Sequence, residues 1–317
     1  MKQYIDTGKK DTRSGFGAGL YEAGKADSRV MALTADLIGS LKMDAFAKDF
    51  PERYVECGIG EANMVGVAAG LAIAGKIPFI GSFAEFMSGR VYDQVRQEVS
   101  YGNTNVKIAA SHAGLTVGED GATHQTMEDI ALMRALPGMV VICPCDYNQT
   151  KAATIAAAQY DGPVYLRFGR PGVPNFTPED QNFEIGKAIL LNEGKDVTVF
   201  ATGHLVWEAL QAAQALEAEG VSVEVIDIAT IKPLDEAAVV ASARKTGAVV
   251  CAEEHNMAGG LGELVAGVLA AQAPTPMEYV NGADLFGQSG TPAQLMKAYG
   301  LDCEGVVKAV KRVLARK

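Results

Sequence analysis

The segment ASHAGLTVGEDGATHQTMED, residues 110–129, concentrates side chains that can exchange protons or bind polar substrates. It holds two of the four histidines of the chain, His112 and His124, together with the carboxylates Glu119 and Asp120. An imidazole can hold or release a proton near neutral pH, and a carboxylate accepts hydrogen bonds from hydroxyl groups. Three glycines interrupt the segment, which is also usual for a solvated loop. The segment is therefore a candidate for acid–base chemistry, with a plain polar loop as the alternative.

The strands expected around this segment would direct reactive groups to one edge of a sheet. Short β-branched runs alternate with Ala-rich stretches, a pattern typical of α/β units around a parallel sheet. Predicted strands end at Thr34–Asp36, Phe83, His112 and Arg167–Arg170. In open α/β sheets, ligands bind outside the carboxyl ends of the strands. This convergence favours a functional site over a plain loop.

The same pattern divides the chain into two α/β halves. In the first half we predict strands at RVMALTAD, IPFIGS, VKIAAS, MVVICP and PVYLRF, and helices over 12–26, 61–75, 84–101, 125–135 and 146–160, the last capped by Asp146. In the second half we predict strands at DVTVFATG, VSVEVIDIATIKP and AVVCAEE, and helices over 204–219, 235–246 and 260–271. The Pro/Gly-rich passage between them reads as a linker. The expected domains are 1–172 and 187–317, joined by a linker over 173–186.

The composition of the chain indicates which kinds of binding partner are improbable. The formal charge of −10 and the lack of a long basic run argue against nucleic acid and against an anionic membrane surface, but not against small anionic substrates. The N-terminus has no apolar signal region, and the most apolar run is interrupted by Lys76 and Pro78. The five cysteines are odd in number and scattered, which predicts reduced, mostly buried thiols. We expect a cytoplasmic protein.

Several motifs resemble one known family. CGIGEANMVGVAAGLA, FIGSFAEFMSGRVYDQVR and SHAGLTVGEDGATHQTMEDIALMRALPGMVVICP resemble the pyrimidine-binding domain of transketolases. DVTVFATG, VIDIATIKPLD, EEH and GGLGE follow in the order of the transketolase C-terminal domain. The resemblance covers nearly the whole chain. It implies an α/β fold of two doubly wound domains, a thiamine-diphosphate pyrimidine-binding domain and a transketolase C-terminal domain, each on a mostly parallel sheet.

One family motif is missing. Transketolases carry, ahead of these domains, a diphosphate-binding domain with a Gly-Asp-Gly…Asn metal motif, and no Gly-Asp-Gly occurs in this chain. The chain thus resembles the C-terminal subunit of a split, two-polypeptide transketolase that holds half of an active site. The resemblance implies thiamine diphosphate as cofactor, with Mg²⁺ or Ca²⁺ held by the partner subunit and no metal ligand in this chain.

The resemblance also assigns cofactor contacts. Glu61 in GIGEANM matches the activating glutamate, and packing among Ile59, Met64 and Val65 would disfavour its charged form; an ordinary glutamate at a helix start is the alternative. Phe83 and Phe86 match two aromatic residues of the pyrimidine pocket, although a phenylalanine pair at this spacing is also common in a core. Asp36 in TADL matches an aspartate near the cofactor, or else caps a helix. Many transketolases have a further tyrosine where this chain has Gly89, and Tyr92 or the partner subunit are the candidates to fill that wall.

Substrate contacts follow from the same motifs. Arg13, Ser40, His112 and Arg170 match the phosphate clamp, and paired guanidinium donors suit phosphate oxygens. Arg167 is the alternative to Arg170 as the last residue of this phosphate clamp.

The remaining residues of the segment separate into two groups. Asp120 and His124 match the pair that handles the substrate hydroxyls, Asp120 by accepting a hydrogen bond and His124 by moving protons during C–C cleavage; a structural histidine is the alternative for His124. Glu119, Glu128 and Asp129 are interpreted as structural or solvated carboxylates. His204, His255 and the glycines at 259, 260 and 262 are interpreted as residues for packing and subunit contact.

The implied activity is transfer of a two-carbon ketol (glycolaldehyde) unit from a ketose phosphate to an aldose phosphate. The expected partners are an N-terminal, diphosphate-binding transketolase subunit and a second copy of this chain, in an α2β2 assembly. The alternatives are a 1-deoxyxylulose-5-phosphate synthase-like subunit, a 2-oxo acid dehydrogenase beta-like subunit and a non-catalytic assembly subunit. The synthase usually has an arginine where His112 stands, which favours transketolase. The segment FAEFMSGRVYDQV, by contrast, is more similar to the synthase and the dehydrogenase beta subunit.

Overall fold

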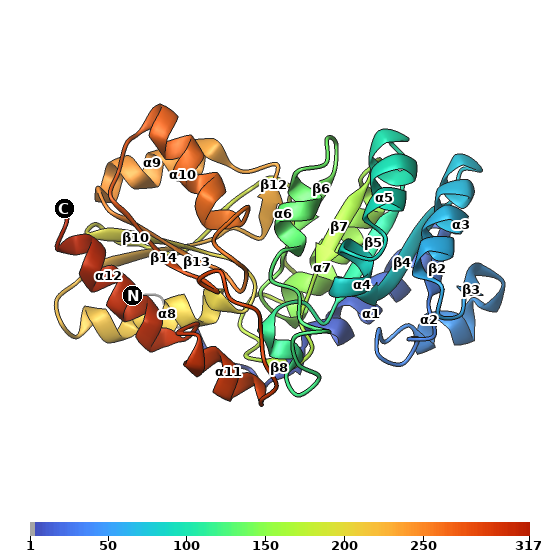
Figure 1. Ribbon diagram of the computed structural model, residues 1–317, viewed down its shortest axis with the longest axis horizontal. Coiled ribbons are helices and arrows are strands. Elements are labelled where there is room, and N and C mark those ends of the chain that lie inside the picture. The colour runs from blue at the N-terminus through green and yellow to red at the C-terminus, as the bar shows by residue number, and fades with distance from the viewer. Residues whose placement is uncertain (1–3) are drawn as a thin grey trace.

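Two sheets organise the chain, and the computed structural model describes residues 4–317 (Figure 1). The first sheet has seven strands in the order β12-β6-β7-β5-β4-β2-β3. Their bounds are β2 (Val30–Thr34), β3 (Tyr54–Glu56), β4 (Ile77–Phe83), β5 (Lys107–Ser111), β6 (Val140–Ile142), β7 (Val164–Arg167) and β12 (Thr230–Lys232). All neighbouring strands are parallel except β12, which runs antiparallel to β6. The ends of β2, β4, β5 and β7 therefore lie along one edge.

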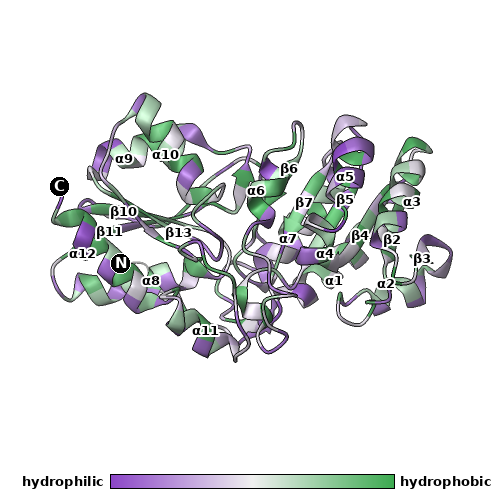
Figure 2. Ribbon diagram, in the orientation of Figure 1, coloured by the Kyte–Doolittle hydropathy of each residue, from purple (hydrophilic) through white to green (hydrophobic). Residues whose placement is uncertain are grey.

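Helices cover both faces of this sheet. They are α1 (Thr12–Ala26), α2 (Asp44–Asp49), α3 (Glu61–Ile73), α4 (Ala84–Ser88), α5 (Tyr92–Gln94), α6 (Asp129–Arg134), α7 (Tyr147–Gln159), and the π-helical turn Val95–Tyr101. Alternate strand residues face opposite cores: Leu33 packs with Met64 of α3, and Ala32 with Phe16 of α1. The predicted doubly wound arrangement is confirmed. In Figure 2 the central strands are mostly green, whereas α5 is purple.

The second sheet has the order β14-β13-β10-β11-β9. Its strands are β9 (Ile189–Asn192), β10 (Val197–Ala201), β11 (Val223–Asp227), β13 (Val249–Ala252) and β14 (Met277–Val280), parallel except for β9. Its helices are α8 (Leu205–Glu217), α9 (Glu236–Thr246), α10 (Leu261–Gln272), α11 (Pro292–Ala298) and α12 (Cys303–Leu314). The elements predicted from the sequence did not include β9, β14, α11 and α12.

The two halves exchange short segments. VSVEVIDIATIKP, predicted as one strand, divides after Asp227: β11 stays in the second sheet, whereas β12 pairs with β6 of the first. In return, the N-terminal arm crosses to the second half, where the Tyr4 hydroxyl donates to the Leu191 carbonyl at 2.9 Å.

Two predicted helices of the first half are wrong in extent. The helix predicted over 84–101 is broken into α4, α5 and the π-helical turn. The helix predicted over 125–135 begins only at Asp129, because tertiary hydrogen bonds hold the preceding residues. The Gln125 amide donates to the carbonyls of Leu115, Gly118 and Gln288, and the Met127 carbonyl accepts from Asn256 N–H.

The predicted cap of α7 is confirmed, and it has a second role. Asp146 accepts from Gln149 N–H at 2.9 Å. Its other carboxylate oxygen accepts from the N–H groups of Phe176 and Thr177 at 2.8 and 2.7 Å. The Pro/Gly-rich passage is thus fixed to the first half by one buried carboxylate.

All five cysteines are free, and Cys143, Cys145 and Cys251 are buried. Over residues 4–317, none of the helices has the length and apolar character that crossing a membrane requires.

Candidate active site

A row of aromatic rings occupies the carboxyl edge of the first sheet. Phe83 ends β4, and His112 follows β5, the adjacent parallel strand. Their rings stack with centroids 3.8 Å apart. Phe86, one helical turn further along the chain, lies parallel to Phe83 at 5.7 Å. Both phenylalanines are only half-buried, so the row leaves aromatic surface open to a ligand.

Two arginines distant in sequence meet beside His112. The short strand β1 (Lys10–Asp11) pairs with β8 (Gly172–Val173). This pairing brings Arg13, which follows β1, near enough to Arg170, which precedes β8, for their charges to interact. Arg13 also donates to the Ser40 carbonyl at 3.3 Å. Burial lowers the pKa of Arg13, and Arg170 contributes to that shift. Residues from four separate parts of the chain, Arg13, Ser40, His112 and Arg170, therefore lie in one neighbourhood.

The imidazole of His112 is neutral at physiological pH. Burial lowers the pKa of His112 to about 3, and Arg13 and Arg170 add repulsion against a third positive charge. His112 also has a φ of +56°, a left-handed conformation that is strained for a residue with a side chain. Its Nδ1 lies 2.8 Å from the Ser111 hydroxyl. Such a fixed, neutral ring can offer a hydrogen bond without adding charge.

The carboxylate of Glu61 lies at the start of α3 and is 5% exposed. Arg90 Nη1 donates to both of its oxygens, at 3.0 and 3.1 Å, and the guanidinium lies 3.9 Å above the centre of the Phe86 ring. Met64 and Val65 are buried beside Glu61 as predicted, but Ile59 is 80% exposed, so that part of the predicted apolar wall is wrong. The loop before α3 turns Ile59 outwards.

Arg90 is a site residue that the sequence motifs did not reveal. It stands next to Gly89, where many transketolases have a further tyrosine, and its guanidinium lies over the Phe86 ring. Tyr92, one of the candidates for that wall, instead packs against the core of the first domain. Phe86 lies on α4 and Arg90 follows the end of that helix at Ser88, so the i,i+4 spacing of the two residues was the available signal.

Asp120 and His124 lie on the loop that follows β5. The His124 ring meets Phe86 edge-on at 5.4 Å, and its Nδ1 lies 3.0 Å from the Thr123 hydroxyl. Asp120 is exposed, with a carboxylate oxygen 4.0 Å from Arg170. Arg170 also donates to the Val117 carbonyl at 2.6 Å. His124 therefore adjoins the aromatic row, and Asp120 adjoins the cationic cluster.

The competing residue Arg167 points elsewhere. Its side chain is 4% exposed and donates to Asp129 at 2.8 Å and to the Glu254 carbonyl at 2.8 Å. Arg170, by contrast, has a side chain that is 39% exposed. Asp129 is fully buried, so the interpretation of Asp129 as a structural carboxylate is confirmed.

Asp36 lies apart from these contacts. It is exposed, and its φ is +59°. Its backbone N–H donates to Glu56 at 2.8 Å, and it caps no helix, since Met43 is the residue before α2. The helix-cap alternative for Asp36 is therefore wrong.

The comparisons with known proteins agree with this geometry. Residues 8–175 match the family profile of the transketolase pyrimidine binding domain, and residues 186–306 match that of the transketolase C-terminal domain. The chain belongs to the transketolase family.

Relatives with high identity extend over nearly the whole chain. A protein named putative transketolase C-terminal section, from Methanocaldococcus jannaschii, is 47% identical over 95% of each chain. The 6-deoxy-6-sulfo-D-fructose transketolase subunit SqwH of a Clostridium species is 45% identical over 94% of this chain and 92% of its own. A solved split gene transketolase, described as an inactive beta4 tetramer, superimposes with a TM-score of 0.90 at 47% identity, covering 97% of this chain and 99% of that one.

Proposed function

We propose that this chain is the C-terminal subunit of a split transketolase, which transfers a two-carbon ketol unit between sugar phosphates together with a separate N-terminal subunit. The observation that carries the proposal is the continuous run of contacts from Glu61 through Arg90, Phe86 and Phe83 to His112. It places a buried carboxylate at one end of an aromatic surface and a cationic cluster at the other. The names and matching lengths of the relatives support the same assignment.

The residues fit the pyrimidine half of thiamine diphosphate. An aminopyrimidine needs an aromatic face and a carboxylate that can share a proton with a ring nitrogen, and half-exposed Phe83 and Phe86 with Glu61 supply both. Asp36, at the end of the adjacent strand β2, is the further cofactor contact that we propose. When bound, thiamine diphosphate supplies the stabilised carbanion that C–C cleavage requires. We assign its diphosphate and the Mg²⁺ or Ca²⁺ to the N-terminal subunit.

The chain's own residues then have distinct tasks. Arg13, Ser40, His112 and Arg170 bind the substrate phosphate, since two guanidinium groups and a neutral N–H donor match its oxygens. Asp120 accepts a hydrogen bond from a substrate hydroxyl. His124 takes and returns the hydroxyl proton during C–C cleavage, because one ring nitrogen is held by Thr123 and the other is left for substrate.

Reconstitution tests the proposal. The chain is purified alone and together with its N-terminal subunit, and each preparation receives thiamine diphosphate and Mg²⁺. Ketose phosphates, 6-deoxy-6-sulfo-D-fructose and pyruvate are offered as donors with an aldose phosphate as acceptor. We expect ketol transfer only from the complex.

Activity of the chain alone would contradict the shared site. Turnover of pyruvate without any turnover of ketose donors would favour the synthase-like or dehydrogenase-like alternative. A complex that forms but stays inactive with every donor would favour the assembly subunit.

A further inference from the structure

The EEH sequence after β13 brings a buried carboxylate from the second half to the loop that carries Asp120 and His124. Glu254 Oε1 accepts from Thr116 N–H at 2.7 Å. Thr116 is four residues from both His112 and Asp120, so this hydrogen bond lies in the middle of the loop. The side chain of Glu254 is 4% exposed.

The loop is shaped to admit this carboxylate. Gly114 has a φ of +78°, and any side chain there would collide with the carboxyl group of Glu254. The Gly114 N–H in turn donates to the Thr126 carbonyl at 3.1 Å, which closes the loop on itself. Glycine at 114 is thus required both by its backbone conformation and by the close approach of Glu254.

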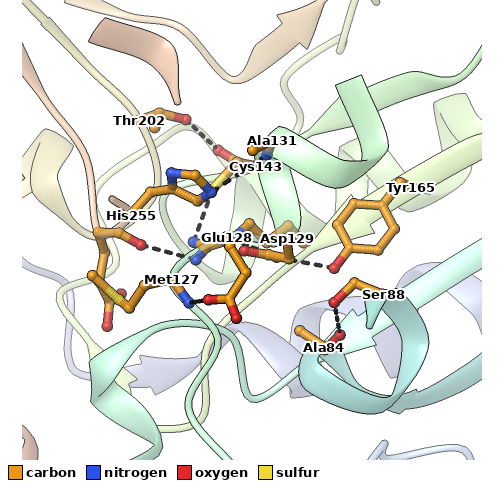
Figure 3. Close-up of polar contacts among 12 residues, drawn as sticks. Ala84, Ser88, Met127, Glu128, Asp129, Ala131, Cys143, Tyr165, Thr202 and His255 are labelled. Carbon is orange, nitrogen blue, oxygen red and sulfur yellow. Dashed lines mark hydrogen bonds and ion pairs between the residues drawn. The ribbon is translucent and has the colours of Figure 1, made fainter. Parts of the chain in front are cut away.

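Neighbouring contacts hold the same segment of the second half in place. The Glu254 carbonyl accepts from Arg167, which in turn pairs with Asp129. Figure 3 shows His255 directed at the backbone of α6, where its Nε2 accepts from Ala131 N–H at 3.4 Å, close to the Asp129–Tyr165 hydrogen bond. Glu254 therefore projects from a fixed support, and its position is not free to follow the loop.

We propose that Glu254 is a positioning residue for substrate: its anionic carboxylate holds the loop over residues 112–124 in the conformation that presents His112, Asp120 and His124, and protonation of Glu254 loosens it. The proposal rests on the proposed function and gives the C-terminal half a task in it. Glu254 touches neither substrate nor cofactor and acts through Thr116.

The charged groups around Glu254 determine the pH range in which its carboxylate gains a proton. The charged or titratable groups that face it are Arg167 at the end of β7, Asp129 at the start of α6 and His204 before α8. Burial raises the pKa of Glu254 to about 6, while Arg167 and Thr116 N–H oppose that rise. Burial lowers the pKa of His204, whose Nδ1 lies 3.6 Å from Glu254, to about 4. Near neutral pH, Glu254 is therefore charged beside a neutral histidine, and a fall below pH 6 weakens its hydrogen bond to Thr116.

Two substitutions at Glu254 separate its acceptor role from its charge. In the reconstituted complex, Glu254→Ala removes the acceptor, and we expect kcat/KM for the ketose donor to fall roughly tenfold or more at pH 7.5. Glu254→Gln is neutral like the protonated carboxyl, so we expect its kcat/KM at pH 7.5 to match the reduced value that the wild type reaches below pH 6. Glu254→Gln should also lack the decline in kcat/KM near pH 6, because it has no proton to gain. Affinity for thiamine diphosphate, measured by calorimetry, should stay unchanged in both variants.

Hydrogen exchange on the full chain without its partner provides a readout that needs no activity. Glu254→Ala should speed amide exchange over residues 113–118 and leave β10 unchanged. The matched control is Glu253→Gln. Glu253 is the adjacent buried carboxylate, but it accepts from Leu261 and Gly262 N–H at the start of α10 and does not contact the loop.

Two results would overturn the proposal: an unaltered decline near pH 6 in Glu254→Gln, or loop exchange in Glu254→Ala no faster than in the control. An inactive wild-type complex would instead refute the proposed function. The hydrogen-exchange result would still test, independently of activity, whether Glu254 holds the loop.

Discussion

Exchanging Arg167 and Arg170 one at a time for methionine should separate folding from substrate binding. The two arginines are three positions apart in sequence: Arg167 ends β7, and Arg170 lies in the segment that follows it. Arg167 is buried and is the cationic partner of the fully buried Asp129. Arg170 is partly exposed beside Arg13 and the substrate loop.

Loss of Arg167 leaves the Asp129 carboxylate buried without a cation. Breaking one partner of a buried ion pair costs about 3–5 kcal/mol. At about 2–4 °C per kcal/mol for a domain of this size, the melting temperature of Arg167→Met should fall by roughly 6–20 °C. The Arg170 ion pairs with Glu119 and Asp120, at 3.4 and 4.0 Å, are exposed, so Arg170→Met should lose no more than about 1 kcal/mol.

The kinetic effects should run in the opposite order. One charge-assisted hydrogen bond to phosphate contributes about 1.5–3 kcal/mol, so Arg170→Met should raise KM for a ketose phosphate roughly 10- to 100-fold. A ketose without phosphate serves as the control donor, and its kcat/KM should be the same in wild type and Arg170→Met.

Stability is measured by urea and thermal unfolding of the chain, and kinetics in the reconstituted complex. The reasoning is refuted if Arg170→Met leaves KM unchanged while Arg167→Met raises KM at wild-type stability.

Three further predictions concern the cofactor end of the site and the response to pH. Glu61→Gln should lower kcat of the complex about 10²-fold or more without changing the circular dichroism of the chain, and a smaller loss would exclude proton exchange by Glu61. Arg90→Ala removes a half-exposed ion pair and a cation–π contact, so the free energy of unfolding should fall by about 1 kcal/mol, with Arg90→Lys recovering part of it. Burial lowers the pKa of three histidines, to about 3 for His112 and to about 4 for His204 and His255. The unfolded chain binds protons at these histidines from about pH 6.5 downwards and the folded chain does not. Between about pH 6.5 and 4.5 three buried carboxyl groups bind protons in the folded chain and offset the histidines, because burial raises the pKa of Asp227 and Glu253 to about 7 and that of Glu254 to about 6. Stability should therefore change little in that range and fall below about pH 4.5. Urea midpoints between pH 3 and 7 test this, and midpoints that rise from pH 4.5 to pH 3 would contradict it.

Local sequence patterns predicted much of the fold because their causes are local. The β-branched runs that end at Thr34, Phe83 and Arg167 are buried on both faces and form strands whatever lies beyond them. Asp146 caps α7 through its own side chain. The spacing of Val306, Val310 and Val313 on α12 is the same kind of local signal, although no helix was predicted there.

Contacts between distant segments could not be read in this way. The run VSVEVIDIATIKP is strand-like throughout. Its second part, β12, belongs to the other sheet only because it pairs with the edge of β6. Gln125 and Met127 are residue types that occur in helices. Their tertiary hydrogen bonds nevertheless keep them outside the helix, and α6 begins only at Asp129.

The sequence by itself determined the residue types of the site and the strands that carry them, because alternation and strand ends depend on neighbours along the chain. Only the tertiary structure decided between Arg167 and Arg170 as the more exposed arginine, since one faces the second half and the other faces solvent. The approach of Arg13 to Arg170 across β1 and β8, and that of Glu254 to Thr116, join residues more than 130 positions apart. Such meetings depend on how two sheets pack, and no local spacing encodes them.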